Sequence, residues 1–398
     1  MATIDTKLPE TPAAHNVGRS TYAVRFATVY LTVDHDLKES AAQIARRLRD
    51  ALNQDSRVLS VSVPKLDESW SHQYAPYYAS EGPDDSTHLI EGTRHFHTQV
   101  FSDPLALKVH VPKKNQPALY EDSEVPTEDY YVLWNGQTLL VAWDHDDSPY
   151  IPSSGGHILE PILEEATERI DAGIYVQPCN PSCKHVFLHR ALLVQADPSA
   201  PAWSVVVDGD DPETLHVRAA TDDQSLEDMS ESVWFQYGSA LRNFADMKNV
   251  ARKILDLEAV VRYDLDRLNS LHHSRASEAQ GPWKGRISAL WKQRGWRRKS
   301  RYYLARLWLG LGTLESASRF WMLERGHFVR SAREADIEPL FVIDASDETA
   351  YIEALDLTLI EASIEHAGGR LDSGALVTAT VGGALAGALI ASVITAFH

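Results

Sequence analysis

The sequence predicts an α+β protein with an N-terminal mixed α/β sheet domain, a C-terminal region of long helices and a single C-terminal transmembrane helix. Three observations lead to this prediction: a strand–helix–strand pattern near the N-terminus, long helical periodicity after residue 230, and an uncharged apolar stretch at residues 374–397. The chain has 398 residues, which is enough for two or three domains with cores of their own.

The predicted boundaries divide the chain into four parts. They are a disordered leader at 1–19, an α/β domain at 20–230, a helical arm or stalk at 231–372, and a membrane segment at 374–397. Apolar residues recur every three or four positions from 233 to 273, which predicts a long helix of the kind found in coiled-coil hairpins. We expect a turn or short strand near 339–344 and a last helix at about 347–367.

Within the sheet domain, the first pattern is strand, helix, strand. Residues 21–33 are rich in β-branched and aromatic types, residues 37–53 have helical spacing, and residues 57–63 alternate. We therefore expect a βαβ unit with parallel strands. Farther along, Asn135-Gly136 separates two apolar runs within 130–143, which predicts a β-hairpin with a type I′ turn.

The stretch at 374–397 has no charged residue and, as a helix, would span about 36 Å, which is enough to cross the hydrocarbon core of a bilayer. Small residues recur every fourth position along it, at Ala375, Ala379, Gly383, Gly387 and Ala391. Such a stripe lets membrane helices approach closely, so we expect homo-oligomers. The alternative is a buried core helix rich in Ala and Gly.

A second signal is the segment 282–314, which contains nine basic residues, six Trp or Tyr residues and no acidic residue. The basic residues are Lys284, Arg286, Lys292, Arg294, Arg297, Arg298, Lys299, Arg301 and Arg306. The first interpretation is binding to the anionic lipid of an inner leaflet. The others are nucleic-acid binding and pairing with the protein's own acidic surface.

The two cysteines of the chain lie near two histidines in the run PCNPSCKHVFLH. Thiolate and imidazole groups are good zinc ligands, so Cys179, Cys183, His185 and His189 are candidates for a zinc site. Only one residue separates Cys183 from His185, which restricts a tetrahedral arrangement. The alternatives are a reversible disulfide and ordinary buried side chains.

Composition excludes some functions and favours others. The net charge of −18 disfavours a general nucleic-acid binder, and the scarcity of cysteine together with a polar N-terminus indicates the cytoplasm. We therefore expect a tail-anchored interaction or effector protein whose cytoplasmic domain senses a ligand or partner, an architecture typical of bacterial stress and antiviral effectors. The alternatives are a membrane-recruiting scaffold, which would use its acidic face or long helix, and a zinc-containing enzyme acting at the membrane.

Overall fold

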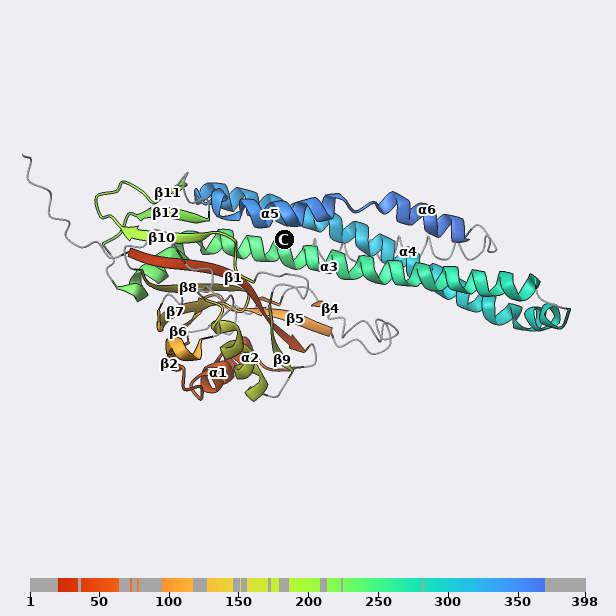
Figure 1. Cartoon of the computed structure of the whole chain (residues 1–398), viewed down its shortest axis with the longest axis horizontal. Coiled ribbons are helices and arrows are strands. Elements are labelled where there is room, and N and C mark those ends of the chain that lie inside the picture. Colours follow the sequence, from red (N-terminus) through yellow and green to blue (C-terminus); the bar gives the residue numbers. More distant parts are fainter. Residues whose placement is uncertain are drawn as a thin grey trace, which may run out of the picture.

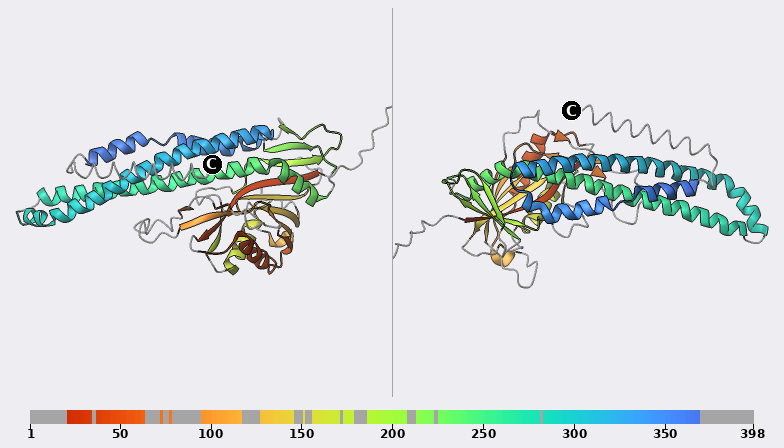
Figure 2. Two further views of the ribbon diagram at one scale, coloured as in Figure 1. Left: turned by 180° about the vertical axis from the view of Figure 1, so that it is seen from behind. Right: turned by 90° about the horizontal axis from the view of Figure 1, so that it is seen from above.

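The computed structural model describes most of the chain between residues 21 and 368. The described residues are 21–34, 37–63, 72–73, 77–78, 95–116, 127–145, 151, 156–170, 173–178, 186–207, 213–222, 225–280 and 283–368. They form a mixed α/β protein, as expected, with a sheet that has helices on both faces and a long helical hairpin that extends beyond it (Figures 1 and 2).

The sheet is built around one long strand, β1. Its strand order is β11-β12-β10-β1-β8-β7-β6-β2, and β5 and β9 also pair with β1. The bounds are β1 Thr21–Asp34, β2 Val58–Ser62, β3 His72–Gln73, β4 Tyr77–Tyr78, β5 His95–Val100, β6 Leu105–His110, β7 Asp129–Trp134, β8 Thr138–His145, β9 Ile174–Pro178, β10 Ala191–Ala196, β11 Ser204–Val207 and β12 Thr214–Ala219. The first half of β1 pairs with β8 and β10, and its second half pairs with β9 and β5.

The predicted strand–helix–strand start is present, but its strands are not neighbours. Helix α1 (Ala41–Leu52) joins β1 to β2, and three antiparallel strands, β8, β7 and β6, lie between them. Four successive antiparallel pairings leave β1 and β2 pointing the same way. The expectation of parallel orientation is therefore confirmed, whereas a direct βαβ pairing is wrong.

Two hydrophobic cores lie on opposite faces of the sheet. Helices α1 and α2 (Leu159–Ile170) cover one face, where Ala27, Val29 and Leu31 of β1 contribute to the core. The other face is covered by long helices, and Tyr22, Val24 and Phe26 of β1 pack there. Because side chains alternate along a strand, β1 supplies both cores at once.

The long helices are α3 (Leu226–Gln280) and α4 (Trp283–Glu334), which pack against each other as a hairpin. At about 1.5 Å per residue, α3 spans roughly 80 Å. Its first part packs on the sheet through residues from Met229 to Ile254. Beyond this, Val261 and Leu268 pack with Leu304, Leu307 and Leu311 of α4 in a separate core. We call the described residues from Val261 to Leu311 the arm.

The chain after α4 forms two shorter helices, α5 (Glu338–Glu353) and α6 (Leu357–Gly368). The strand or turn expected near 339–344 is wrong, because these residues lie in α5. Pro339 stands in the first turn of α5, where proline favours helix initiation. Leu340 and Phe341 then bury one face of α5 in the core that the long helices form with the sheet, which we call the sheet-side core. Asp344 is buried on α5 as well.

The hairpin between β7 and β8 is confirmed, but its turn is not type I′. The Asn135 amide donates to the Thr138 oxygen at 3.2 Å, so Gly136 and Gln137 are the central residues of the turn. Gly136 has a φ of +86°, whereas neither Asn135 nor Gln137 is among the described residues with positive φ. A positive φ at the first central position only is the pattern of a type II′ turn. The Asn135 side-chain oxygen accepts hydrogen bonds from the backbone amides of Gln137 and Thr138, at 3.0 and 2.8 Å. Asn135 thus stabilises the turn from the position that precedes its two central residues.

The predicted membrane segment at 374–397 lies outside the described residues. Among the helices that the structure describes, none combines the length and the apolar character needed to cross a bilayer.

The buried position of the β7–β8 turn yields a first testable expectation. A Cβ at Gly136 would lie 2.3 Å from the backbone oxygen of Gln99, and the positive φ adds strain. Gly136→Ala should lower the free energy of unfolding by about 3 kcal/mol or more, measured by urea unfolding in mild detergent.

Gly295, an exposed residue of α4, is the matched control, because a Cβ there meets no atom within 4 Å. Gly295→Ala should raise stability by up to about 1 kcal/mol, since alanine is the better helix former. Equal unfolding midpoints for Gly136→Ala and the unchanged chain would contradict the packing of the turn against Gln99.

Candidate functional site

The face of β1 toward α3 changes from apolar to polar halfway along the strand. Tyr22, Val24 and Phe26 are followed on the same face by Thr28, Tyr30 and Thr32, all of them at most 4% exposed. Thr98 of β5 is the register partner of Thr32, so it lies on this face as well. Burial of this many hydroxyl groups requires polar partners.

Helix α3 supplies charged residues opposite this polar face. Arg242, Asp246, Lys248, Arg252 and Lys253 are interleaved with the α3 residues of the first core, Asp256 follows that core directly, and Glu324 approaches from α4. We call these residues, with Tyr30 and Gln137, the α3 polar site. Lys248 and Arg252 are at most 8% exposed, and the Lys248 ammonium lies 5.5 Å from the Phe244 ring centre.

Two hydrogen bonds connect the sheet to α3 at this site. The Tyr30 hydroxyl donates to the backbone oxygen of Ala245 at 2.8 Å, and Gln137 Nε2 donates to Asp246 Oδ1 at 2.5 Å. Gln137 belongs to the buried β7–β8 turn, whose backbone oxygens accept from Val29 and Leu31 of β1. The turn therefore holds the Asp246 carboxyl against the centre of the sheet.

Burial shifts the ionisation of several groups here. It raises the pKa of Asp246 to about 7, and the nearby Glu324 adds to the effect, while Gln137 and Arg242 oppose it. Burial also raises the pKa of Asp256 to about 6, against the attraction of Arg252, and it lowers the pKa of Lys253. Groups with perturbed pKa values cluster at functional sites more often than elsewhere, which makes this the best candidate in the described part of the chain.

Among the described residues, four buried polar atoms in or beside this site have no hydrogen-bond partner. They are Gln137 Oε1, Asn135 Nδ2, Thr138 Oγ1 and Thr98 Oγ1. Such groups bind polar atoms readily, because leaving them unpaired costs free energy. The arrangement is suited to binding a small polar or charged ligand, and Asp246 changes its charge near neutral pH.

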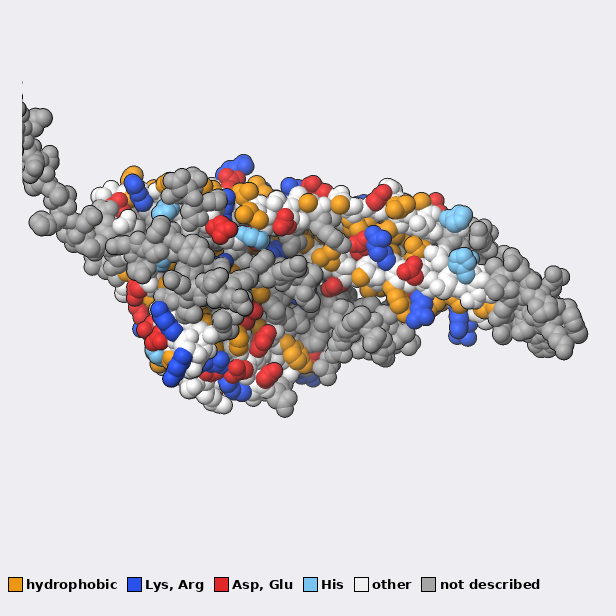
Figure 3. All heavy atoms as spheres, in the orientation of Figure 1, with side chains coloured by type: hydrophobic (Ala, Val, Ile, Leu, Met, Phe, Trp, Pro, Cys, Tyr) orange, Lys and Arg blue, Asp and Glu red, His pale blue; other side chains and the backbone are white. Residues whose placement is uncertain are grey.

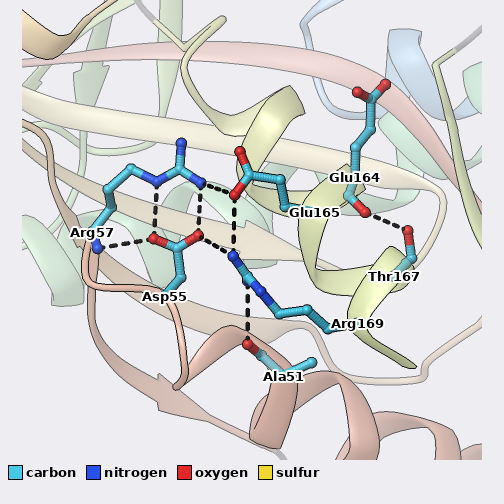
Figure 4. Close-up of polar contacts among 7 residues, drawn as sticks. All are labelled: Ala51, Asp55, Arg57, Glu164, Glu165, Thr167 and Arg169. Carbon is cyan, nitrogen blue, oxygen red and sulfur yellow. Dashed lines mark hydrogen bonds and ion pairs between the residues drawn. The ribbon is translucent and has the colours of Figure 1, made fainter. Parts of the chain in front are cut away.

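A second ionic cluster joins α1, β2 and α2, and all of its charges are balanced (Figure 4). Arg57 donates to both oxygens of Asp55, at 2.9 and 2.6 Å, and its Nη2 also donates to Glu165 at 2.7 Å. Arg169 lies 3.3 Å from Asp55 and 3.1 Å from Glu165. These bonds, with Arg57 the largest cause, lower the pKa of Asp55 to about 2. The cluster fastens α2 to the start of β2 and has a structural role.

The structure describes one of the four predicted zinc ligands, His189, and the zinc site stays a prediction. Cys179, Cys183 and His185 lie outside the described residues. His189 precedes β10, where its Nδ1 lies 2.9 Å from Asp344 Oδ1 of α5 and its backbone amide donates to Asp344 Oδ2 at 3.2 Å. In the described part of the chain, no group of three or more His, Cys, Asp or Glu side chains is placed to hold a metal ion.

Residues 283–314 of the basic segment lie within α4. Arg297, Arg298, Lys299 and Arg301 are exposed on the arm. Lys284, Arg286, Lys292 and Arg294 belong to the same helix, in a part where the structure describes only the backbone. The small-residue stripe from Ala375 to Ala391 lies outside the described residues.

Comparisons with protein-family models, curated proteins and solved structures give no match to this chain. We therefore infer the candidate site from its geometry alone.

Reading the sequence did not identify the α3 polar site. Asp246 and Lys253 stand seven residues apart in the helical repeat, and Thr28 and Thr32 interrupt the apolar alternation of the first strand. Each signal is weak alone, because a charged helical residue usually faces solvent. Only the fold shows that the two polar stretches face each other.

The raised pKa of Asp246 predicts a pH-dependent gain from Asp246→Asn. Between about pH 4 and 7 the unfolded carboxyl has lost its proton while the folded one retains it, so this group makes folding less favourable as pH rises. The Asn variant stays neutral and keeps the oxygen that accepts from Gln137. Its stability should match the unchanged chain near pH 4 and exceed it by on the order of 2 kcal/mol at pH 8.

Thermal or urea unfolding at pH 4 and pH 8 measures this difference. Asp266, an exposed carboxylate on the same helix, is the control, and Asp266→Asn should leave stability unchanged at both pH values. A destabilised Asp246→Asn at pH 8 would show that the carboxylate is needed in its charged form.

Proposed function

We propose that this protein is a membrane-associated interaction protein with a sensing base and a binding arm. The sheet domain forms the base, the α3 polar site takes a ligand, and the α3–α4 hairpin contacts partners or further copies of the chain. Residues 374–397 attach it to a membrane. The bulk of the chain would then lie on the cytoplasmic side, as in effectors that assemble at a bilayer.

The observation that best supports this proposal is the division of α3 into two parts. Its first part belongs to the sheet-side core, whereas Val261 and Leu268 belong to a second core with residues of α4 and α6. Arg306 and Asp264 form a buried ion pair at 2.9 Å within this second core. A hairpin that is stabilised internally can extend from its base and present its outer surface (Figure 2).

A ligand at the α3 polar site would act directly on the arm. Tyr30 and Gln137 contact consecutive residues of α3, Ala245 and Asp246, two to three turns before the helix leaves the sheet-side core. A ligand that competes for these hydrogen bonds would alter the seating of the helix. This supports the sensing role, because a shift in population requires contacts that differ between two states.

The charge distribution supports attachment to an anionic surface. The chain as a whole carries a net charge of −18, yet the exposed residues Arg297, Arg298 and Lys299 are consecutive on the arm. Each basic residue near an anionic leaflet contributes about 1 kcal/mol of binding. Repulsion of the acidic base from the same leaflet would orient the arm toward the membrane.

A zinc-containing enzyme acting at the membrane is the alternative, and one observation favours it. The bond from His189 Nδ1 to Asp344 is the carboxylate–histidine arrangement that orients metal-ligating imidazoles. Metal analysis of the purified chain and of its Cys179→Ser/Cys183→Ser variant tests this reading. Stoichiometric zinc that is lost in the variant would favour the enzyme or a structural zinc site, and would direct attention to His185 and His189.

Membrane fractionation with a carbonate wash tests the attachment. Full-length protein should remain in the membrane fraction, whereas a chain ending at Asp372 should be soluble, because it lacks the apolar stretch. Recovery of the full-length protein in the soluble fraction would contradict the anchor.

Vesicle binding of the chain ending at Asp372 tests the arm separately. Arg297→Ala/Arg298→Ala/Lys299→Ala should weaken binding to phosphatidylserine vesicles on the order of 100-fold, at about 1 kcal/mol per charge. Lys38→Ala/Lys113→Ala/Lys114→Ala removes three exposed charges from the base and should have little effect. Equal losses in both triple variants would indicate that net charge alone governs binding.

A further inference from the structure

Helix α4 has a second apolar face, on the side away from α3. Tyr302, Leu309 and Leu323 recur at multiples of seven residues and are 50%, 44% and 56% exposed. Small residues follow three positions later in the same repeat, at Ala305, Gly312 and Gly326, and the third repeat is polar, with Ser316 and Arg319. Positions spaced three and four apart in a heptad are those that form a helix–helix seam.

This outer face is separate from the one that α4 buries. The inner residues Leu304, Leu307, Leu311, Leu314 and Trp321 are at most 3% exposed. On the outer side, Met322 and Val329 widen the exposed apolar surface, at 60% and 38%. Figure 3 shows apolar side chains at the surface of the helical layer, interspersed with charged ones.

We infer that the outer face of α4 binds residues 374–397 of the same chain before they enter a membrane. This inference rests on the proposed function, in which that stretch is the anchor. It adds a stored state, in which the protein covers its own apolar segment in water. Membrane insertion then requires release of the segment from α4.

The position of α6 brings the segment to this face. Ile360 and Ile364 of α6 pack in the same core as Leu304, Leu307 and Leu311 of α4. Gly368, the last residue of α6, is separated from Gly374 by five residues, which can span about 20 Å. The segment therefore begins within reach of the Tyr302 end of the outer face.

The lengths of the two surfaces agree. The outer face from Tyr302 to Val329 covers 27 residue steps, or about 40 Å of helix, and 24 residues of the segment would cover about 36 Å. α4 runs toward the sheet from this point, so a segment that starts beside Tyr302 would lie along α4 toward Val329. Neither end would extend beyond its partner by more than about one helical turn.

The side chains of the two surfaces are compatible as well. The segment has small residues every fourth position, including Gly383 and Gly387, and the outer face has Ala305, Gly312 and Gly326. Because a Cβ at Gly326 would meet no atom within 4 Å, the helix backbone is open to close approach there. Small residues on both helices permit the close packing that stabilises such pairs without polar contacts.

Photo-cross-linking of the full-length chain tests the inference. A photoreactive amino acid replaces Leu309 or Leu323, and the controls carry it at Leu59 and Val206, which are 63% and 50% exposed on the sheet. In detergent-free solution, the two α4 probes should cross-link to peptides within 374–397, and the controls should not. Mixing unlabelled and ¹⁵N-labelled protein distinguishes cross-links within one chain from those between two.

Three results would overturn the inference. The first is cross-links between chains, which would make the face a contact between copies. The second is cross-links to added lipid only, and the third is an absence of cross-links to 374–397. Cross-linking within one chain that persists at full yield after adding vesicles would support docking while contradicting the anchor function. The two proposals can therefore fail independently.

A charge variant gives a second readout. Leu309→Glu/Leu323→Glu should release the segment and increase transfer to neutral phosphatidylcholine vesicles about tenfold, since the docked state no longer competes. Leu59→Glu/Val206→Glu is the matched control and should transfer as the unchanged chain does. Equal transfer by the α4 variant and the control would count against the stored state.

Discussion

The packing of α3 across one face of the sheet is the contact on which the rest of the structure depends. Residues from Met229 to Ile254 complete the core that Tyr22, Val24 and Phe26 of β1 begin. Without this helix, one face of a mixed sheet would expose its apolar side chains to water, which is costly in proportion to their area. Helices α4 and α5 then close the same core from outside through Trp321 and Phe341.

The polar break in this contact gives α3 its second role. Where β1 changes to Thr28, Tyr30 and Thr32, this strand no longer offers apolar side chains to the helix, and hydrogen bonds from Tyr30 and Gln137 add to the apolar burial that α3 keeps through residues such as Met247. Buried polar contacts contribute less net stability than apolar burial of similar size, but they are strict in geometry. These hydrogen bonds therefore position the helix specifically in the stretch that leads to the arm.

The sequence was sufficient to predict the elements with clear periodicity and insufficient for those decided by tertiary contacts. The first strand, helix α1, the β7–β8 hairpin and the long helix follow from local patterns. Residues 339–344 resemble a strand in composition, and they are helical because Pro339 starts a helix whose apolar face meets an existing core. The separation of β1 from β2 depends on three strands that come later in the chain, so no local pattern contains it.

The candidate site could not be predicted for the same reason. More than 100 residues separate Tyr30 from Gln137, and more than 100 separate Gln137 from Asp246. Each of the three residues is ordinary in its own segment. By contrast, the basic stretch was visible in the sequence because its meaning is local: consecutive Arg297, Arg298 and Lys299 on a helix face water in almost any fold.

The two faces of α4 connect the arm to the membrane proposal in physical terms. A hairpin needs only one apolar face to be stable, and Leu304, Leu307 and Leu311 supply it. The additional exposed face of Tyr302, Leu309 and Leu323 lowers solubility without stabilising the described fold, so a partner that covers it gains the full benefit of apolar burial. An apolar segment tethered beside this face is present at a high effective concentration and would compete well with any partner free in solution. A membrane can take the segment away from α4, because the bilayer buries the segment on all sides, whereas α4 covers only one side of it.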